Sequence, residues 1–417
     1  MSDKKNVPKI RFPGFTEPWE QRKLEDIYGS IGNAFVGTAT PYYVESGHFY
    51  LESNNIKDGQ INHNTEVFIN DEFYEKQKDK WLHTGDMVMV QSGHVGHAAV
   101  IPEELNNSAA HALIMFRNPK KEIEPYFLNY QYQTLKSKKK IENITTGNTI
   151  KHILASEMQQ FEVDMPELAE QKKIAEYFRA LDHLITLHQR KLEHVKKMKK
   201  SMLQKMFPKK NQLYPEVRFP GFTDAWEQRK LGELVKEGIL EAPLDGNHGE
   251  KHPTSDEYVD SGIPFLMASD IHNGEVNIYS CKYITKERAE RLDKGFARNG
   301  DVLLTHKATI GETAILSNLM TEYAMLTPQV TYYRIKNEER LNREYLYSFF
   351  NSLDFQTELK TKAAQSTRPY IGITAQQNLK IILPAEIDEQ IRIGLYFRNL
   401  DHLITLHQRK QNGRNLK

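Results

Sequence analysis

The sequence predicts a mixed α/β protein: two tandem domains of common fold, separated by a long antiparallel two-helix coiled coil and related by a pseudo-two-fold axis. Two internal repeats and one helical pattern predict it. The segment VPKIRFPGFTEPWEQR at Val7–Arg22 returns as YPEVRFPGFTDAWEQR at Tyr214–Arg229, 207 residues later. The segment LDHLITLHQRK at Leu181–Lys191 returns letter for letter at Leu400–Lys410, 219 residues later. A period of about 200 residues far exceeds the roughly 20–50 residues of solenoid repeats, so each unit is a domain in its own right.

The helical pattern follows the first variable region. A helix is predicted from near Glu167 to Met206, where Phe207 and Pro208 end it. Ten positions along it alternate steps of four and three and eight of the ten are apolar, which is a heptad stripe. These positions are Ile174, Phe178, Leu181, Ile185, His188, Leu192, Val195, Lys199, Met202 and Met206. The second copy repeats the stripe at Ile393, Phe397, Leu400, Ile404 and His407.

An apolar stripe needs a partner, so the two repeat helices are expected to pair. Antiparallel pairing is favoured because two like units about a pseudo-two-fold axis point their helices in opposite directions. The second stripe stops at Gln411–Asn412–Gly413, and the counterpart of Leu192–Met206 is missing. Either the chain is truncated there, or the distal half of the first helix packs on another surface.

The repeats also set the expected domain boundaries. The chain divides into a first domain at 1–166 that opens with the repeat segment 7–24, a central helix at 167–206, a linker at 207–216, a second domain at 217–384 and a short distal helix at 385–417. Strands are predicted at Val67–Asn70, Asp86–Val90, Leu113–Phe116 and Asp301–Thr305, and helices at Tyr126–Lys140 and Arg343–Lys360.

Composition narrows the class of protein. Hydrophobic residues make up 39% of the 417 residues and the net charge is +1, so any basic surface for nucleic acid must be local. No apolar run approaches the ~20 residues of a membrane span, and MSDKKNVPK at the start lacks the apolar segment of a signal peptide. A single cysteine, Cys281, excludes internal disulfides. The expected location is therefore the cytoplasm, with no membrane partner.

The variable regions correspond to each other even where their letters differ. Gly85–Gly96 (GDMVMVQSGHVG) aligns with Gly300–Gly311 (GDVLLTHKATIG), and Leu51–Gly59 aligns with Leu266–Gly274, both at an offset of 215. Each of the first pair is a turn, a short strand, a polar loop and a closing glycine. Both inserts are therefore expected to share one fold and to differ mainly in the polar chemistry of their loops.

Polar side chains on such loops can discriminate base edges, and glycines let the backbone approach phosphates. The candidate DNA contacts are Ser53, Asn54, Lys57, Gln91, Ser92, His94, Asn148 and Lys151 in the first insert, and Ser269, His272, Thr305, His306, Lys307, Thr309, Ser366, Thr367, Arg368 and Tyr370 in the second. The alternative is that these are ordinary turns at strand ends. For the basic runs KSKKK at Lys136–Lys140 and KKMKK at Lys196–Lys200, a solvated helix face is favoured over a contact with DNA.

Signatures of enzymes are absent. The sequence has no GxGxxG, no Gly-Lys dipeptide and no HExxH, and none of its 17 prolines is followed by Pro or Asp. His94 and His97 are three residues apart but have no cysteine and no carboxylate before Glu103 to complete a metal site. No catalytic residue and no metal site are predicted.

In this order and present twice, these segments resemble the specificity subunit of type I restriction-modification enzymes, over essentially the whole chain. The resemblance lies in RFPGF(T) with WEQRKL at Arg11–Leu24 and Arg218–Leu231, in the two glycine-bounded strand-loops, and in the helix AEQKKIAEYF with LDHLITLHQRK at Ala169–Lys191. Its second copy, DEQIRIGLYF with LDHLITLHQRK, spans Asp388–Lys410.

The resemblance implies two target-recognition domains, each reading one half of a bipartite site in double-stranded DNA. It implies that the repeated helices set the gap and dock methyltransferase subunits, usually two, which endonuclease/translocase subunits then join. The expected docking and coiled-coil residues are Ile174, Phe178, Leu181, Ile185, Leu192, Ile393, Phe397, Leu400 and Ile404. Adenine N6 methylation, S-adenosylmethionine, ATP and Mg²⁺ would belong to the partners, and this chain would bind no cofactor.

Two other classes stay open on the sequence. One is an adaptor whose two α/β domains bind proteins or RNA without DNA specificity. The other is a self-contained modification enzyme, against which the missing catalytic motifs argue.

Overall fold

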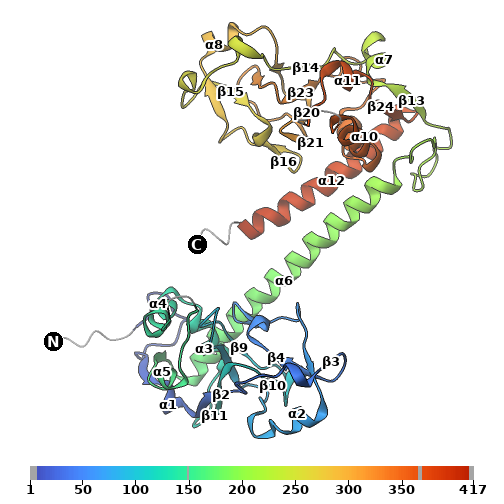
Figure 1. Ribbon diagram of the computed structural model, residues 1–417. Coiled ribbons are helices and arrows are strands. Elements are labelled where there is room, and N and C mark those ends of the chain that lie inside the picture. The colour runs from blue at the N-terminus through green and yellow to red at the C-terminus, as the bar shows by residue number, and fades with distance from the viewer. Residues whose placement is uncertain (1–6, 148–149, 365–368, 413–417) are drawn as a thin grey trace. The chain divides into compact units, whose positions relative to one another are not determined.

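The computed structural model describes residues 7–147, 150–364 and 369–412 (Figure 1). The chain forms two compact units, Met1–Leu184 and Ile185–Lys417, and the long helix α6, Leu168–Lys205, continues from the first into the second. Among the helices described, none has the length and apolar character that crossing a membrane requires.

Each unit is built on a four-stranded antiparallel sheet. In the first unit the order is β2 (Tyr28–Asn33), β11 (Leu113–Pro119), β8 (Met87–Val90) and β9 (Ala98–Val100). The second unit repeats it with β14 (Leu244–Asp245), β23 (Val330–Tyr333), β20 (Val302–Lys307) and β21 (Thr309–Ile315). The predicted strands at 86–90, 113–116 and 301–305 and the predicted common fold are thereby confirmed.

Continuous apolar runs form these strands because both faces of the sheet are covered. Met87 and Met89 pack into the core on the helical side, while Val88 and Val90 pack into a second core on the opposite face. All four side chains are fully buried. The second unit repeats the alternation at residues 302–304.

A second, smaller sheet closes the opposite face. Its strands are β10 (Ala109–Ala110), β4 (His48–Leu51), β7 (Phe68–Ile69) and β3 (Tyr43–Val44) in the first unit, and β18 (Lys282–Ile284), β15 (Ile263–Leu266), β22 (Ala324–Leu326) and β19 (Phe296–Ala297) in the second. Each contains one parallel pair, β4 with β10 and β15 with β22. The strand predicted at Val67–Asn70 is confirmed as β7.

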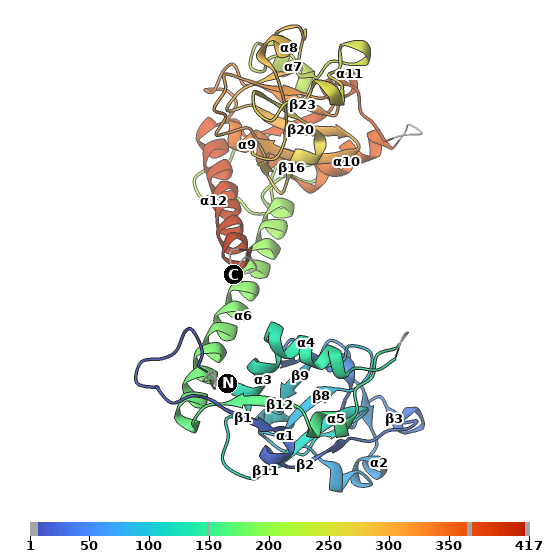
Figure 2. The same cartoon turned by 90° about the vertical axis from the view of Figure 1, so that its left-hand side faces the viewer.

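Short helices complete each unit (Figure 2). They are α1 (Leu24–Ile27), α2 (Asp71–Glu75), α3 (Pro125–Tyr132), α4 (Leu135–Ile144) and α5 (Ala155–Gln159) in the first unit, and α7 (Leu231–Lys236), α8 (Lys286–Glu290), α9 (Arg343–Phe350), α10 (Leu353–Ala363) and α11 (Ile373–Gln377) in the second.

The prediction of single helices at Tyr126–Lys140 and Arg343–Lys360 is wrong, because each is two helices. Thr134 has extended backbone and its Oγ1 accepts a hydrogen bond from the Ser137 N–H, which caps a new helix. Ser352 is likewise extended, with ψ of 151°, at the start of α10.

In each unit, the opening segment pairs with the segment that precedes the long helix. Strand β1 (Glu20–Lys23) pairs with β12 (Glu162–Met165), and β13 (Glu227–Lys230) pairs with β24 (Lys380–Leu383). Beside each pair, an arginine of the RFPGF motif forms two hydrogen bonds to a buried glutamate. Arg11 binds Glu170 at 2.7 Å through both Nε and Nη2, and Arg218 binds Glu389 at 2.7 and 2.8 Å.

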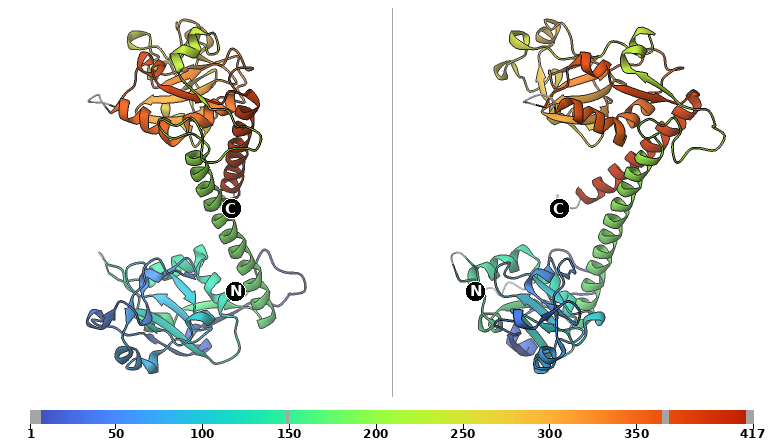
Figure 3. Two further views of the ribbon diagram at one scale, coloured as in Figure 1. Left: turned by 90° about the vertical axis from the view of Figure 1, so that its right-hand side faces the viewer. Right: turned by 45° about the vertical axis from the view of Figure 1, so that its right-hand side comes forward.

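In the second unit the distal part of α6 runs antiparallel to α12 (Ile387–Asn412) (Figures 1 and 3). The rings of His188 and His407 lie 5.6 Å apart, and Lys199 Nζ lies 2.5 Å from an Asp401 carboxylate oxygen. Because positions rise along α6 while they fall along α12, the predicted antiparallel pairing is confirmed over this stretch.

The distal half of α6 also packs on the second unit's own core. Val195, Met206 and Phe207 are buried in one cluster with Trp226 and Tyr345. The stretch that has no counterpart in the second copy therefore packs on this domain.

We expect Glu389→Ala to lower the melting temperature of the second unit by roughly 5–15 °C, because it leaves the Arg218 guanidinium unpaired where it is mostly covered. Differential scanning calorimetry measures this. Glu290→Ala, which breaks an exposed ion pair with Lys286 in the same unit, is the matched control. Equal shifts for the two variants would contradict a structural role for the Arg218–Glu389 pair.

Candidate nucleic-acid interface

Several of the predicted residues gather at the tip of one hairpin in each unit. In the first unit the tip joins β8 to β9 at residues 91–97. The Ile153 N–H donates to the Gln91 carbonyl oxygen at 3.0 Å, and Ser92 forms an isolated antiparallel β-bridge with His152. These two contacts hold Lys151, whose side chain is exposed, beside the tip. The structure thus brings the predicted residues Gln91, Ser92 and Lys151 together.

Helix α4 lies directly against the same tip. Gly96 has φ of 86°, and a Cβ there would lie 2.8 Å from Ile141 Cγ2, so only glycine allows the approach. Between them is a pocket of about 350 Å³ that His94, Lys138 and Lys151 line. Lys138 was not among the predicted contacts, although it belongs to the KSKKK run, because nothing local shows that α4 packs here.

A second hairpin reaches the tip from the side. Strands β5 (Ile56–Lys57) and β6 (Gln60–Ile61) are joined by Asp58-Gly59, whose φ angles of 49° and 82° are those of a tight hairpin turn. The Asp58 N–H donates to His97 Nδ1 at 3.2 Å. Burial lowers the pKa of His97, Asp58 opposes this, and His94, Lys138 and Lys57 lower it further. The predicted residues Lys57 and His94 thus lie close to His97, whose lowered pKa favours its neutral form.

Ser53 and Asn54 lie on the turn that leads into this hairpin. Ser53 is half-buried and Asn54 is exposed, and the Asn54 carbonyl accepts from Asn62 Nδ2 at 3.2 Å.

In the second unit the tip between β20 and β21 is tighter. Ala308 has φ of 67°, and Lys307 and Thr309 on either side of it are exposed. Lys307 forms an isolated antiparallel β-bridge with Tyr370. Tyr370 is 37% exposed, and its ring lies 5.5 Å from the ring of His306. Lys307, Thr309 and Tyr370 therefore form the exposed part of this tip.

Thr305 and His306 are fully buried, so in this structure they support the tip and do not face a duplex, which corrects their prediction as contacts. Thr305 Oγ1 accepts from the Glu312 N–H at 3.0 Å, and His306 Nδ1 lies 3.1 Å from the Ile371 carbonyl oxygen. The physical reason is that β20 continues past Thr305 to Lys307, through an irregularity between Leu304 and His306.

Beside His306 is a buried aspartate, held by partly exposed cationic partners, that the sequence did not reveal. Asp245 is 2% exposed, binds Lys294, and lies 2.9 Å from His248 Nε2 and 3.9 Å from His306 Nε2. Burial alone raises the pKa of Asp245, but the bonds from Lys294 and His248 outweigh it and the pKa is lowered. Burial lowers the pKa of His306 to about 4. His306 is therefore neutral, and its Nε2 has no hydrogen-bond partner within the described ranges.

The equivalent position in the first unit is uncharged. Asn33 pairs with Ile114 of β11, as Asp245 pairs with Thr331 of β23. The Asn33 Oδ1 is also buried and, among the described residues, has no hydrogen-bond partner. The two units thus place different chemistry at one position of a shared frame.

Ser269 and His272 are exposed and belong to the hairpin of the second unit that corresponds to β5–β6 of the first. Strands β16 (Ile271–His272) and β17 (Glu275–Val276) form a hairpin, and Thr405 of α12 donates to Glu275 at 3.1 Å. His272 lines a cavity with Thr405 and Gln408, to which none of the residues 305–309 contributes. The Asn273 N–H of this hairpin donates to Glu312 Oε2 at 3.3 Å, as the Asp58 N–H donates to His97 in the first unit, so the hairpin lies beside β21. Asn148, Ser366, Thr367 and Arg368 lie outside the described residues.

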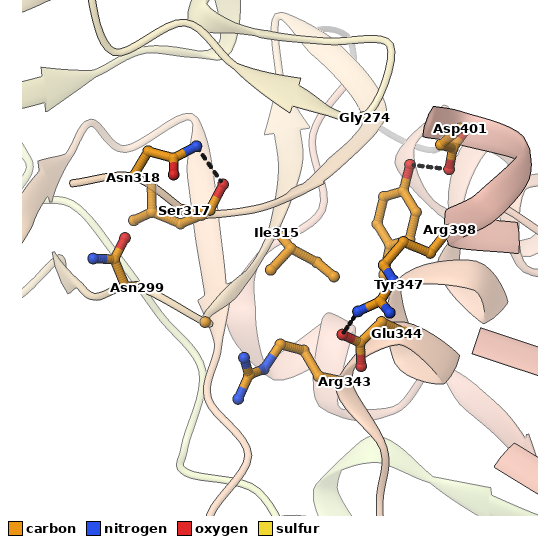
Figure 4. Close-up of a pocket in the computed structure, with 12 residues that line it drawn as sticks. Gly274, Asn299, Ile315, Ser317, Asn318, Arg343, Glu344, Tyr347, Arg398 and Asp401 are labelled. Carbon is orange, nitrogen blue, oxygen red and sulfur yellow. Dashed lines mark hydrogen bonds and ion pairs between the residues drawn. The ribbon is translucent and has the colours of Figure 1, made fainter. Parts of the chain in front are cut away.

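A cleft of about 490 Å³ in the second unit is not a competing site (Figure 4). Its charged groups are already paired: Arg398 binds Glu344 at 3.2 Å, and the Tyr347 hydroxyl donates to Asp401 at 3.1 Å. No predicted contact lines it. Within the described residues, no group of three or more His, Cys, Asp or Glu could hold a metal ion.

A family model agrees with this architecture. The model for the type I restriction modification DNA specificity domain matches residues 16–197 and 223–413, one match for each repeat. The chain belongs to this family.

Other members of the specificity family are distant in sequence. The type I restriction enzyme MjaVIII specificity subunit of Methanocaldococcus jannaschii is 22% identical over 98% of this chain and 91% of its own. The EcoBI specificity subunit of Escherichia coli is 24% identical over 60% of this chain and 53% of its own. The crystal structure of the S subunit from M. genitalium aligns with a TM-score of 0.62 at 13% identity, covering 98% of this chain and 96% of that one, and so supports the fold.

We expect His306 to make the second unit sensitive to acid. Its folded pKa of about 4 lies below the ordinary 6.5, so the unfolded chain binds the proton more readily and stability falls as the pH drops from about 6.5 towards 4. This costs on the order of 2 kcal/mol at pH 5 relative to pH 7.5. His306→Gln, which copies Gln91 of the first unit, should flatten this dependence in urea unfolding curves. An unchanged slope would show that His306 does not titrate in this window.

Proposed function

We propose that each unit reads one half of a bipartite site in double-stranded DNA through its hairpin tip. The observation that carries the proposal is the repetition of one hairpin construction with different polar chemistry. The first tip offers Gln91, Ser92 and His94, and the second offers Lys307 and Thr309. Polar side chains held on a rigid tip can distinguish bases by about 1–3 kcal/mol for each good pair of hydrogen bonds.

The local charges support this proposal. The net charge is only +1, yet Lys57, Lys138 and Lys151 gather around the first tip. Lysines near a tip can neutralise phosphates and hold the tip in register without reading sequence. Partner subunits can supply further phosphate contacts, which fits a nearly neutral chain.

Two equivalent docking sites for methyltransferase subunits are our second proposal. Leu184 and Leu187 of α6 are 45% and 46% exposed, and their repeat counterparts Leu403 and Leu406 of α12 are 39% and 40% exposed. Identical apolar side chains left in solvent in both copies suit two copies of one partner. Endonuclease/translocase subunits would then join this complex.

Catalysis is assigned to those partners. We propose that adenine N6 methylation, with S-adenosylmethionine, and restriction, with ATP and Mg²⁺, take place on partner subunits, and that this chain contributes recognition alone. The proposed location is the cytoplasm, where such a complex meets DNA. Membership of the DNA specificity family favours this function over a protein- or RNA-binding adaptor.

We expect cells that express this chain with its methyltransferase partner to carry N6-methyladenine in a split motif. Long-read sequencing of their DNA detects the modification and names the motif. The matched control is the methyltransferase expressed without this chain, which should leave no motif. A continuous motif, or the same motif in the control, would contradict the proposal.

Lys307→Ala should weaken binding of the purified complex to its target on the order of tenfold and reduce the slope of log affinity against log salt by about 1. The reason is that Lys307 is the exposed cation of the second tip. Fluorescence anisotropy at several salt concentrations measures both effects. Lys286→Ala, an exposed lysine of α8, is the control. Unchanged affinity and slope would remove Lys307 from the contact surface.

A further inference from the structure

A cavity of about 470 Å³ in the second unit lies between helix α10, strands β13 and β24, and the segment that follows α6. Phe349, Phe355 and Ile382 line it, and each of these side chains is at most 7% exposed. The volume falls in the range of sites for small molecules, which are mostly apolar with a few placed polar groups. None of the predicted DNA contacts lines this cavity.

Two buried oxygens at this cavity, Ser352 Oγ and Asp354 Oδ2, have no hydrogen-bond partner among the described residues. Both residues line the cavity at the N-terminus of α10, and Ser352 is only 1% exposed. Ser352 occupies the cap position, yet its hydroxyl caps no N–H of the helix. A buried polar group without a partner costs free energy, so this end of the cavity lacks a hydrogen-bond donor.

The same corner of the first unit is occupied by an ion pair. Lys136 is the second residue of α4, and its Nζ lies 2.5 Å from a carboxylate oxygen of Asp164, the third residue of β12. The equivalent second residue of α10 is Asp354, and the equivalent third residue of β24 is Ile382. The second unit therefore keeps a carboxylate at this corner, now on the helix, while an apolar side chain stands where its partner would be.

The other charges around the cavity are those of its lysines and one glutamate. Lys362 pairs with Glu358 at 2.8 Å. Lys210 and Lys380 are exposed and form no ion pair within the part of the chain that the structure describes. A ligand with a single charge of either sign would meet one unfavourable group, whereas a ligand with both charges can meet the carboxylate at one end and a lysine at the other.

We propose that this cavity binds a small aromatic zwitterion of the amino-acid class. Its ring packs on Phe349, Phe355 and Ile382. Its ammonium group donates to Asp354 and Ser352, which restores an ion pair at this corner with the polarity opposite to that of the first unit. Its carboxylate faces Lys210 and Lys380. This binding goes beyond the proposed reading of DNA and does not depend on it.

The test titrates the full chain with L-tryptophan by isothermal titration calorimetry, and a Kd on the order of 0.1–1 mM is expected for a ligand of this size. Indole-3-propionate, which lacks the amine, should bind about tenfold more weakly, and tryptamine, which lacks the carboxylate, should bind less tightly than tryptophan. Asp354→Asn should weaken tryptophan binding about tenfold, because it removes the charge that meets the ammonium group. Asp260→Asn, at an exposed aspartate of the same unit, is the matched control and should leave binding unchanged.

A double variant, Asp354→Lys with Ile382→Asp, copies the ion pair of the first unit into the cavity. It should abolish tryptophan binding while circular dichroism shows that the chain stays folded. No saturation by tryptophan at millimolar concentrations, equal binding of tryptophan and indole-3-propionate, or unchanged binding by Asp354→Asn would each overturn the proposal. Water alone would then occupy the polar end of the cavity.

Discussion

The fold of each unit depends on closing the two ends of its variable region against each other. Strands β1 and β12 pair at the base of the first unit and β13 and β24 at the base of the second. A buried glutamate at the start of each long helix binds the arginine of the opening motif, Arg11 with Glu170 and Arg218 with Glu389. Breaking one partner of such a pair is costly, because the other charge is left without compensation.

This closure explains how the middle of each unit can change while its ends do not. The insert leaves and returns at one fixed place, so its loops can alter without moving the long helices. The two inserts use this freedom at one position: the first has neutral Asn33 near its tip, while the second has Asp245 among Lys294, His248 and His306. The neutral form of His306 beside buried Asp245 is lost as the pH falls, which couples this tip to pH. The same scaffold therefore presents two chemically distinct tips.

Much of this could be predicted from the sequence, because repeats and heptads are local or periodic signals. The offset of 215 between Gly85–Gly96 and Gly300–Gly311 is enough to place Gln91 and Lys307 at equivalent tips. The heptad stripe predicts the antiparallel helix pair through positions such as His188 and His407. These signals need only the order of residues along the chain.

What the sequence missed depends on contacts between distant segments. Lys138 lies at the first tip because Ile141 packs against Gly96, which is 45 positions earlier in the chain. No sequence pattern around either residue predicts this contact. His306 looks like a loop residue, but an irregular strand carries it into the core beside Asp245. The helix breaks at Thr134 and Ser352 were missed because both residues are tolerated inside helices as well as at their starts.

We propose that each unit recognises its half of the DNA site independently of the other unit, because paired strands close the two ends of its variable region against each other. The most direct measurement replaces residues 28–166 with the corresponding region of another family member and maps N6-methyladenine in cells that also express the methyltransferase partner. The account predicts that one half of the split motif changes while the other half and the gap stay as they were. A change in both halves, or in neither, would contradict it.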